Sequence, residues 1–277
     1  MGSNPVSPTT NNSSYLPNIF VIGIILYSIS GVVMTTQEPS LAETRVCDIV
    51  TELPVRGAVF SKFGIDFCCG GRDTLAKTCE EKGIEINDVI VQIGYIDSMN
   101  SKSERGKFDK MSATELCDHI ENTHHVFLKQ HLPITSQHAD KVARVHGERE
   151  PYLKEVAQVF GQLRAELEPH MMKEEQILFP LIRQLDGSTT LPESHCGSVR
   201  NPIRAMFNEH HAAGQALAKL SELTNSYTPP MHACNTYRAL FGELALLEKD
   251  THDHIHKENH VLFIKAQEIE RDLIQQA

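Results

Sequence analysis

Three stretches in the second half of this 277-residue chain repeat apolar residues in alternating steps of three and four. They begin at Leu153, Val199 and Leu240, and a further helix is expected over about residues 112–131. This spacing lines up apolar side chains on one face of an α-helix, and no alternating strand pattern competes with it. The sequence therefore predicts an all-α fold in which residues 111–272 form a four-helix bundle. Residues 133–150 are expected to add a helical turn or two, and loops are expected at the prolines: Pro133, Pro151, Pro192, Pro202, Pro229 and Pro230.

Each stripe is interrupted by ionisable residues at positions where an apolar side chain is expected. These residues are His170 and Glu174 in the first stripe, His210 in the second, and His254 and Glu258 in the third. A carboxylate inside a bundle is costly unless it is paired or bound to a metal. The i, i+4 spacing of each His/Glu pair stacks both side chains on one helix face. A bound cation is the simplest compensation.

A single histidine on an apolar helix face is more often a hydrogen-bonded core residue than a ligand. Repetition on three helices reverses that expectation. Two His/Glu pairs and two further histidines would supply six ligands, too many for one tetrahedral zinc ion but suited to two iron or manganese ions that share carboxylates. The remaining histidines mostly fall off the stripes and are expected at the surface or behind the ligands: His119, His124, His131, His138, His195, His211, His232, His252, His256 and His260.

The first half of the chain has a different organisation. Residues 41–96 are expected to form a small helical domain, and the polar segment 97–110 a linker. Residues 1–40 form an N-terminal extension whose apolar run, 19–34, is shorter than the roughly 18 to 20 residues of a spanning helix. No Lys or Arg precedes this run, unlike the start of a signal peptide. A mis-started or disordered extension, with Met34 as an internal start, is favoured over a membrane anchor.

Charge and cysteine content narrow the functional classes. The formal net charge is -10 and there is no basic block, so nucleic acid is not expected as a partner. The seven cysteines are an odd set without regular spacing, unlike a secreted disulfide framework. A reducing, cytoplasmic compartment is therefore expected.

Two adjacent cysteines, Cys68 and Cys69, lie between Phe67 and two glycines. A helix is expected to start near Arg72, and its amide groups together with this arginine would lower the pKa of a thiol. A reactive or metal-binding thiol pair is one hypothesis. Two small buried residues in a tight turn are the alternative.

Four motifs together resemble the RIC family of iron-sulfur cluster repair di-iron proteins, over residues 41–268. They are DFCCGG at 66–71, HMMKEEQILFP at 170–180, FNEHHAAG at 207–214 and DHIHKENHVLF at 253–263. The resemblance implies a small cysteine-containing domain followed by a hemerythrin-like bundle with two iron ions. It also implies a histidine eight residues before Pro133, which is His125, although helical periodicity slightly favours His124. His146 matches a family histidine placed behind the ligands. The implied ligands are His125, His170, Glu174, His210, His254 and Glu258.

The resemblance further implies a role in repairing iron-sulfur clusters damaged by nitric oxide or oxidants, by donation of iron. Cys68 and Cys69 would accept iron or contact the client. The expected partners are damaged or apo iron-sulfur proteins, nitric oxide or oxygen as small ligands, and an electron donor that the sequence does not identify. The oligomeric state stays open, with a homodimer among the options. The alternatives are nitric oxide reduction at the di-iron centre and a nitric oxide or oxygen carrier or sensor.

Overall fold

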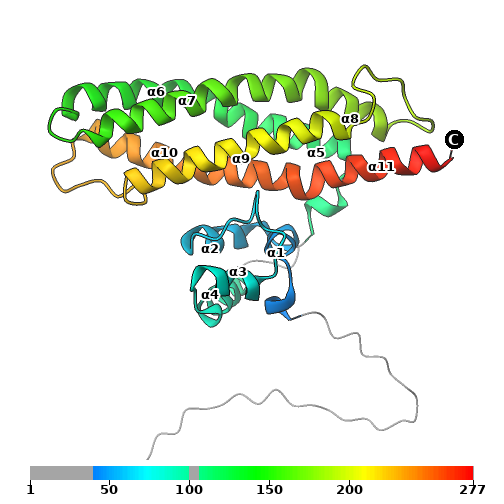
Figure 1. Cartoon of the computed structure of the whole chain (residues 1–277), viewed down its shortest axis with the longest axis horizontal. Helices are drawn as coiled ribbons and strands as arrows, with labels where there is room; N and C mark the ends of the chain where they lie inside the picture. Colours follow the sequence, from blue (N-terminus) through cyan, green and yellow to red (C-terminus); the bar gives the residue numbers. More distant parts are fainter. Residues whose placement is uncertain (1–39, 100–105, 277) are drawn as a thin grey trace, which may run out of the picture. The chain divides into compact units, whose positions relative to one another are not determined.

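The computed structural model describes residues 40–99 and 106–276, drawn as coloured ribbons in Figure 1. The described residues belong to one compact unit and are helical apart from loops, with one isolated β-bridge between Arg45 and Thr74. The predicted all-α fold is confirmed. The N-terminal extension with its apolar run lies outside the described residues. Within the described part of the chain, no helix is both long and apolar enough to cross a membrane.

Residues 40–99 fold into short helices around a shared apolar core. They are η1 (Leu41–Glu43), α1 (Val46–Glu52), η2 (Pro54–Arg56), α2 (Gly57–Lys62), α3 (Leu75–Lys82) and α4 (Ile86–Met99). The side chain of Thr74 accepts a hydrogen bond from the Lys77 amide and caps α3, which therefore begins three residues after the expected start near Arg72. α4 continues to Met99, three residues into the predicted linker.

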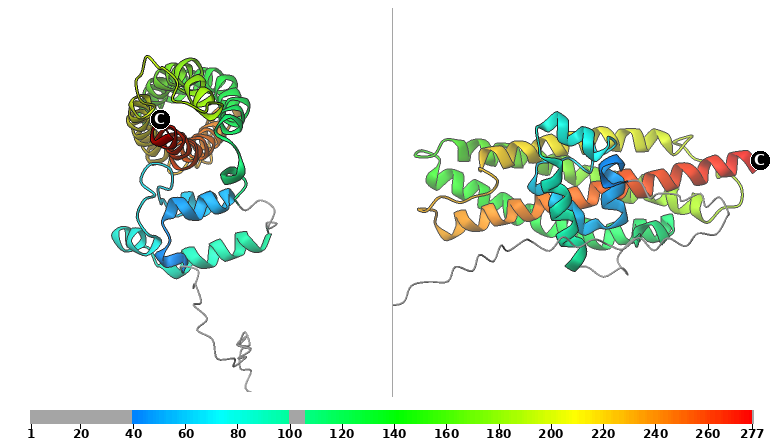
Figure 2. Two further views of the ribbon diagram at one scale, coloured as in Figure 1. Left: turned by 90° about the vertical axis from the view of Figure 1, so that its right-hand side faces the viewer. Right: turned by 90° about the horizontal axis from the view of Figure 1, so that it is seen from below.

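The bundle consists of four long helical segments, seen end-on in the left view of Figure 2. The first is α5 (Ala113–Ile120), η5 (Glu121–His125) and α6 (Val126–His146), preceded by the short η4 (Phe108–Lys110). The second is α7 (Tyr152–Lys173), η6 (Glu174–Leu178) and α8 (Phe179–Asp186). The third is α9 (Arg200–Leu223), and the fourth is α10 (Asn235–Lys257), η7 (Glu258–Leu262) and α11 (Phe263–Gln276).

Two prolines that were expected in loops lie inside helices. Pro133 is in α6, and Pro202 is in the first turn of α9. A first-turn proline costs little because its missing N–H would have no helical partner there. Pro133 removes an internal hydrogen bond, but the helix continues because its far half buries an apolar face that includes Ala139 and Val142. The prediction of only a turn or two after Pro133 was therefore wrong.

The apolar core is divided into two clusters along the bundle. In every helical segment, the two clusters lie on opposite sides of the interrupting His and Glu residues, except that Met171 and Ile255 lie between the His and Glu of their pairs. In the second segment, for example, Leu167 and Met171 belong to one cluster, and Leu178 and Phe179 to the other. The interrupting residues thus form a polar layer between two apolar regions.

Candidate metal centre

Three π-helical turns, η5, η6 and η7, lie at the polar layer. A π-helical turn inserts one extra residue, so the buried face shifts by one position. After Glu174 the shift buries Leu178, whereas Ile177, a member of the predicted stripe, is 49% exposed. In the first segment, the π-helical turn η5 places the next inward-facing residue five positions after Ile120 instead of four. This residue is His125, which therefore lies in the layer.

All six residues predicted as ligands come together in this layer, in two groups that share Glu174 and Glu258. Within each group, one potential ligand atom from every residue lies within 4.8 Å of the others. In the first group, His125 Nε2 is 3.2 Å from a Glu174 oxygen and His254 Nε2 is 3.0 Å from a Glu258 oxygen. The second group consists of His170, His210 and the same two glutamates.

In the second group, His170 Nε2 lies 3.2 Å from a Glu174 oxygen. His210 Nε2 lies 3.1 Å from a Glu258 oxygen. Each carboxylate is therefore approached by an imidazole from both groups. This is the arrangement in which a carboxylate bridges two cations, one in each group.

The two shared carboxylates are fully buried. Among the residues that the structure describes, none of their four oxygens has a hydrogen-bond partner, nor has Nε2 of His125 or His254. Burial raises the pKa of Glu258, but the neighbouring His254 and His210 outweigh it and hold that pKa well below its usual range. Buried ionised oxygens and imidazole nitrogens without partners fit a pair of cations of the iron type.

Three of the four predicted ligand histidines are held in orientation by a hydrogen bond that Nδ1 donates, on the side of the ring away from the two glutamates. This atom of His125 donates to Glu175 at 2.7 Å, and that of His170 donates to Glu209 at 2.8 Å. The Nδ1 of His210 donates to the side-chain oxygen of Asn259, also at 2.8 Å. Each bond fixes the tautomer that leaves Nε2 free to bind a metal. The sequence reasoning missed these three acceptors, although each immediately follows a predicted ligand glutamate or precedes His210.

His124, the neighbour favoured by periodicity, lies outside both groups. It is buried, its Nδ1 lies 2.9 Å from an Asp250 oxygen, and its ring stacks on His254 with centroids 5.3 Å apart. Burial is the main cause that lowers its pKa to about 2, so the ring is neutral. It packs against a predicted ligand without joining the cluster.

His146 does not lie behind the ligands as expected. It is the last residue of α6, about 31 Å along that helix from His125 at about 1.5 Å per residue. Its Nε2 is 3.4 Å from Cys234 Sγ, and its ring lies 5.5 Å from that of Tyr237. The family resemblance matched a histidine by local sequence, but the long helix carries this residue to the other end of the bundle.

The cysteine turn, residues Asp66–Gly70, is organised by one carboxylate. Asp66 accepts hydrogen bonds from the amides of Cys68, Cys69 and Gly70, each at 2.9 Å. The two sulfur atoms are 3.7 Å apart and, with Asp66, form a third group that can hold a metal. The hydrogen bond to Cys69, burial and the Asp66 charge all raise the pKa of Cys68. The lowered thiol pKa expected for this pair is not found at Cys68, and Arg72 packs over the Phe207 ring, 5.6 Å from its centre.

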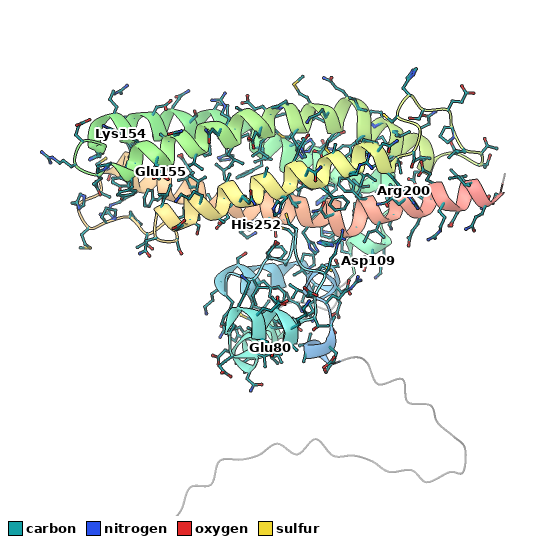
Figure 3. All side chains as sticks on the ribbon, viewed as in Figure 1. Glu80, Asp109, Lys154, Glu155, Arg200 and His252 are labelled. Atoms are coloured by element: carbon teal, nitrogen blue, oxygen red, sulfur yellow. The ribbon has the colours of Figure 1, made fainter. Side chains whose placement is uncertain are left out.

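The cysteine turn contacts the bundle at the polar layer. Cys69 Sγ is 3.6 Å from the carbonyl oxygen of His210, and Asn259 Nδ2 donates to the carbonyl of Cys68 at 3.0 Å. A cavity of about 570 Å³ opens beside the turn and is lined by both cysteines and by residues of the bundle. One of these is His252, labelled in Figure 3 on the side of the bundle next to the short helices. Cys69 is partly exposed and Cys68 is buried, and the turn that carries both thiols touches the polar layer.

Comparison with known proteins agrees with this arrangement. The hemerythrin HHE cation binding domain matches residues 117–266, and a domain of unknown function called ScdA_N matches residues 42–96. The fold and the paired clusters therefore define a ScdA_N domain followed in the sequence by a hemerythrin-type di-iron bundle.

Named relatives identify the family. The iron-sulfur cluster repair protein ScdA of Staphylococcus haemolyticus (strain JCSC1435) is 32% identical over 223 residues, which cover 80% of this chain and 97% of the relative. The iron-sulfur cluster repair protein YtfE of Escherichia coli O157:H7 is 33% identical over 219 residues, which cover 79% and 94%. The chain belongs to this family of iron-sulfur cluster repair proteins. The resemblance seen in the sequence motifs is confirmed.

Proposed function

We propose that this protein repairs iron-sulfur clusters damaged by nitrosative or oxidative stress, by donating iron to the damaged or apo client. The observation that carries the proposal is the pair of fully buried carboxylates shared by two histidine groups, next to free thiols. A buried set of candidate iron ligands with thiols beside it supports storage of iron and its transfer through sulfur.

The six residues of the polar layer are the proposed iron ligands, namely His125, His170, Glu174, His210, His254 and Glu258. When bound, the two irons supply redox change and ligand exchange. The four imidazoles point Nε2 toward the glutamate oxygens and would hold an ion through this atom, and the two glutamates each face both groups. Because Glu174 and Glu258 each face both groups, a change in the position of either carboxylate would alter the donor set of a bound ion and would favour its release.

The cysteine turn is the proposed first acceptor of released iron. Ligands about 2.3 Å from a tetrahedral ion lie about 3.8 Å apart, close to the observed sulfur separation of 3.7 Å. Each thiol of Cys68 and Cys69 gives its proton to solvent when it binds the ion, and Asp66 supplies a third donor. The thiols must stay reduced for this role, so the proposal places the protein in a reducing compartment such as the cytoplasm.

Transfer of iron to a client tests the proposal. The iron-loaded full chain is mixed with an apo iron-sulfur protein, and rebuilding of the client's cluster is followed by its absorption while sulfide is supplied. The Cys68→Ala/Cys69→Ala chain should keep its iron but transfer it more slowly, and the His170→Ala/His254→Ala chain should hold no iron. The matched control is Cys196→Ala/Cys234→Ala, which removes two thiols that line neither the turn nor the layer. Full transfer by the Cys68→Ala/Cys69→Ala chain would exclude the thiol route.

Nitric oxide reduction is the alternative reaction at the same centre. It would use the ligands of the bundle but gives Cys68 and Cys69 no role. The same variants therefore separate the two functions. Nitrous oxide formation with an added electron donor, undiminished in the Cys68→Ala/Cys69→Ala chain and accompanied by no iron transfer, would replace the repair proposal with a reductase.

A further inference from the structure

The polar layer contains an internal repeat. Residues 170–179 (HMMKEEQILF) and 254–263 (HIHKENHVLF) both begin with a predicted ligand histidine and both contain a π-helical turn from the ligand glutamate onward. The two segments share five of ten residues, and these include the predicted ligand histidine and glutamate of each segment. The shared pairs are His170/His254, Lys173/Lys257, Glu174/Glu258, Leu178/Leu262 and Phe179/Phe263.

The repeat differs directly after each ligand glutamate. In the first segment this position is Glu175, whose carboxylate accepts from His125 Nδ1 at 2.7 Å and from Lys129 at 2.6 Å. In the second segment it is Asn259, which is buried. Both residues support a histidine from a neighbouring helix, but only an amide offers an N–H on its other side.

Asn259 uses both ends of its amide. Its oxygen accepts from Nδ1 of the predicted ligand His210 at 2.8 Å, and its nitrogen donates to the carbonyl of Cys68 at 3.0 Å. His260 also donates to the Cys68 carbonyl, at 2.9 Å, and His256 donates to the carbonyl of Phe67 at 3.1 Å. The first segment has Met172 and Gln176 at these two positions. The second copy of the repeat is thus adapted to hold the backbone of the cysteine turn.

We propose that Asn259 is a positioning residue that couples the cysteine turn to His210, so that the state of the thiols controls how firmly one of the two irons is held. The inference rests on the proposed function and deepens it by naming which iron is transferred. His210 belongs only to the group with His170. The ion in that group responds to the turn, whereas the ion in the group with His125 and His254 stays.

The contact of the turn with α9 provides a way to displace it. Cys69 Sγ is 3.6 Å from the carbonyl of His210, and a Cβ at Gly214 would lie only 3.7 Å from the same sulfur. A carboxamidomethyl group on Cys69 replaces the thiol hydrogen that reaches the His210 carbonyl, so alkylation removes this contact and lets the turn move relative to α9. The turn is tied to Asn259 through Cys68, so the movement pulls on the bond that orients His210.

The experiment measures loss of iron to a chelator, from the iron-loaded full chain carrying Cys196→Ser and Cys234→Ser, before and after alkylation of Cys69 with iodoacetamide. Once Cys196 and Cys234 are replaced, every remaining cysteine except Cys69 is buried, so iodoacetamide should react at Cys69. Alkylation should speed the release of one iron per chain by about tenfold or more and leave the other unchanged, since partners behind a ligand histidine affect metal affinity by about 10- to 100-fold.

Asn259→Asp isolates the coupling. An aspartate keeps an oxygen for His210 Nδ1, as Glu175 does for His125, but has no N–H for the Cys68 carbonyl. This chain should bind both irons and lose them at rates that alkylation does not change. Glu175→Gln is the matched control in the other half of the repeat, and its response to alkylation should equal that of the unsubstituted chain. Helicity by circular dichroism checks that each variant is folded.

Three results would overturn the coupling: no change on alkylation, equal acceleration of both irons, or a full alkylation response in Asn259→Asp. The chelator assay contains no client protein. A chain that shows the coupling but fails to rebuild a client's cluster would refute the proposed function alone, and a chain that transfers iron with no response to alkylation would refute the coupling alone.

Discussion

Two clusters in the bundle combine histidines with carboxylates, the second with tyrosine hydroxyls as well, and they differ in how their polar atoms are satisfied. The first cluster is the polar layer with the six predicted ligands, called the metal layer here. Its Glu174 and Glu258 are fully buried, and their oxygens have no hydrogen-bond partners among the residues described. At the end near His146, Glu150 accepts hydrogen bonds from the hydroxyl of Tyr237 at 3.4 Å and from His232 at 3.3 Å. Both clusters combine histidine with carboxylate, but only in the first do buried carboxylate oxygens lack hydrogen-bond partners among the residues described.

The difference teaches that histidine content alone does not mark a metal site. The end cluster is partly open to solvent, and its groups bond to each other, including a direct contact between the hydroxyls of Tyr152 and Tyr237. Such a cluster is stable as it stands. The buried carboxylates of the metal layer need a cation or a proton, and the imidazoles approach them with Nε2 free for metal. Unsatisfied buried ligand atoms therefore separate a functional cluster from a structural one.

The largest expected effect comes from removing a shared carboxylate. Glu174→Leu or Glu258→Leu should reduce iron from about two ions per chain to less than one, because each residue serves both groups. The bundle should stay folded, since leucine fits an apolar layer and removes a buried charge. Metal analysis and circular dichroism give the two readouts. Glu150→Leu in the end cluster is the control and should keep its iron; collapse of helicity in the Glu174 variant would make the site chiefly structural.

A smaller effect concerns the pH dependence of stability in the metal-free chain. Burial lowers the pKa of His170, but the charge of Glu174 outweighs it and raises that pKa from 6.5 to about 9. A raised folded-state pKa stabilises the fold fully below pH 6.5, and the stabilisation is lost as the pH rises through about 9. The loss should be about 3 kcal/mol, since a change of one pKa unit corresponds to about 1.4 kcal/mol.

Urea unfolding of the metal-free chain across this pH range measures the loss. The His170→Ala chain, which lacks the titrating group, should show a flatter profile. A metal-free chain whose stability rises between pH 6.5 and about 9 would contradict a protonated His170 in the empty layer.

Most of the bundle and five of the six layer residues follow from helical periodicity, because an ionisable residue at a core position stands out in a regular stripe. The sixth shows the limit of that method. The step from Ile120 to His125 crosses a π-helical turn, which no local sequence pattern announces, so a regular count leads to His124 instead. The same effect placed Ile177 in the predicted stripe although Leu178 is the buried residue.

Tertiary contacts account for the remaining differences. The pKa of Cys68 is raised by Cys69, burial and Asp66, and the helix start that would have lowered it begins later, at Leu75. Asn259 gave no signal as a single residue. Its role becomes visible only when the two repeat segments are aligned and the amide is seen to bridge His210 and the cysteine turn.

In the end cluster, a moderate loss of stability is expected when one hydrogen-bonding group is removed. Tyr237 is fully buried, and its hydroxyl bonds to Tyr152 and Glu150. Tyr237→Phe keeps the packing and removes one hydroxyl, so the free energy of unfolding should fall by about 1 kcal/mol. A thermal melt of the iron-loaded chain should show a decrease of roughly 2 to 4 °C. Iron content should not change, and any loss of iron would link this cluster to the metal layer.

The smallest expected effect belongs to His146, and it tests the comparison most directly. His146→Ala should leave iron per chain unchanged and alter stability by no more than about 0.5 kcal/mol, because the ring is partly exposed and contacts Cys234 and Tyr237 rather than a ligand. His210→Ala is the matched substitution in the metal layer and should lower the iron content. If His146→Ala reduced iron as His210→Ala does, the end cluster would have to approach the irons in the working protein. The placement of His146 behind the ligands, which the family resemblance implied, would then be right. The continuous helix α6 would be wrong, because a helix from Val126 to His146 keeps its two ends apart.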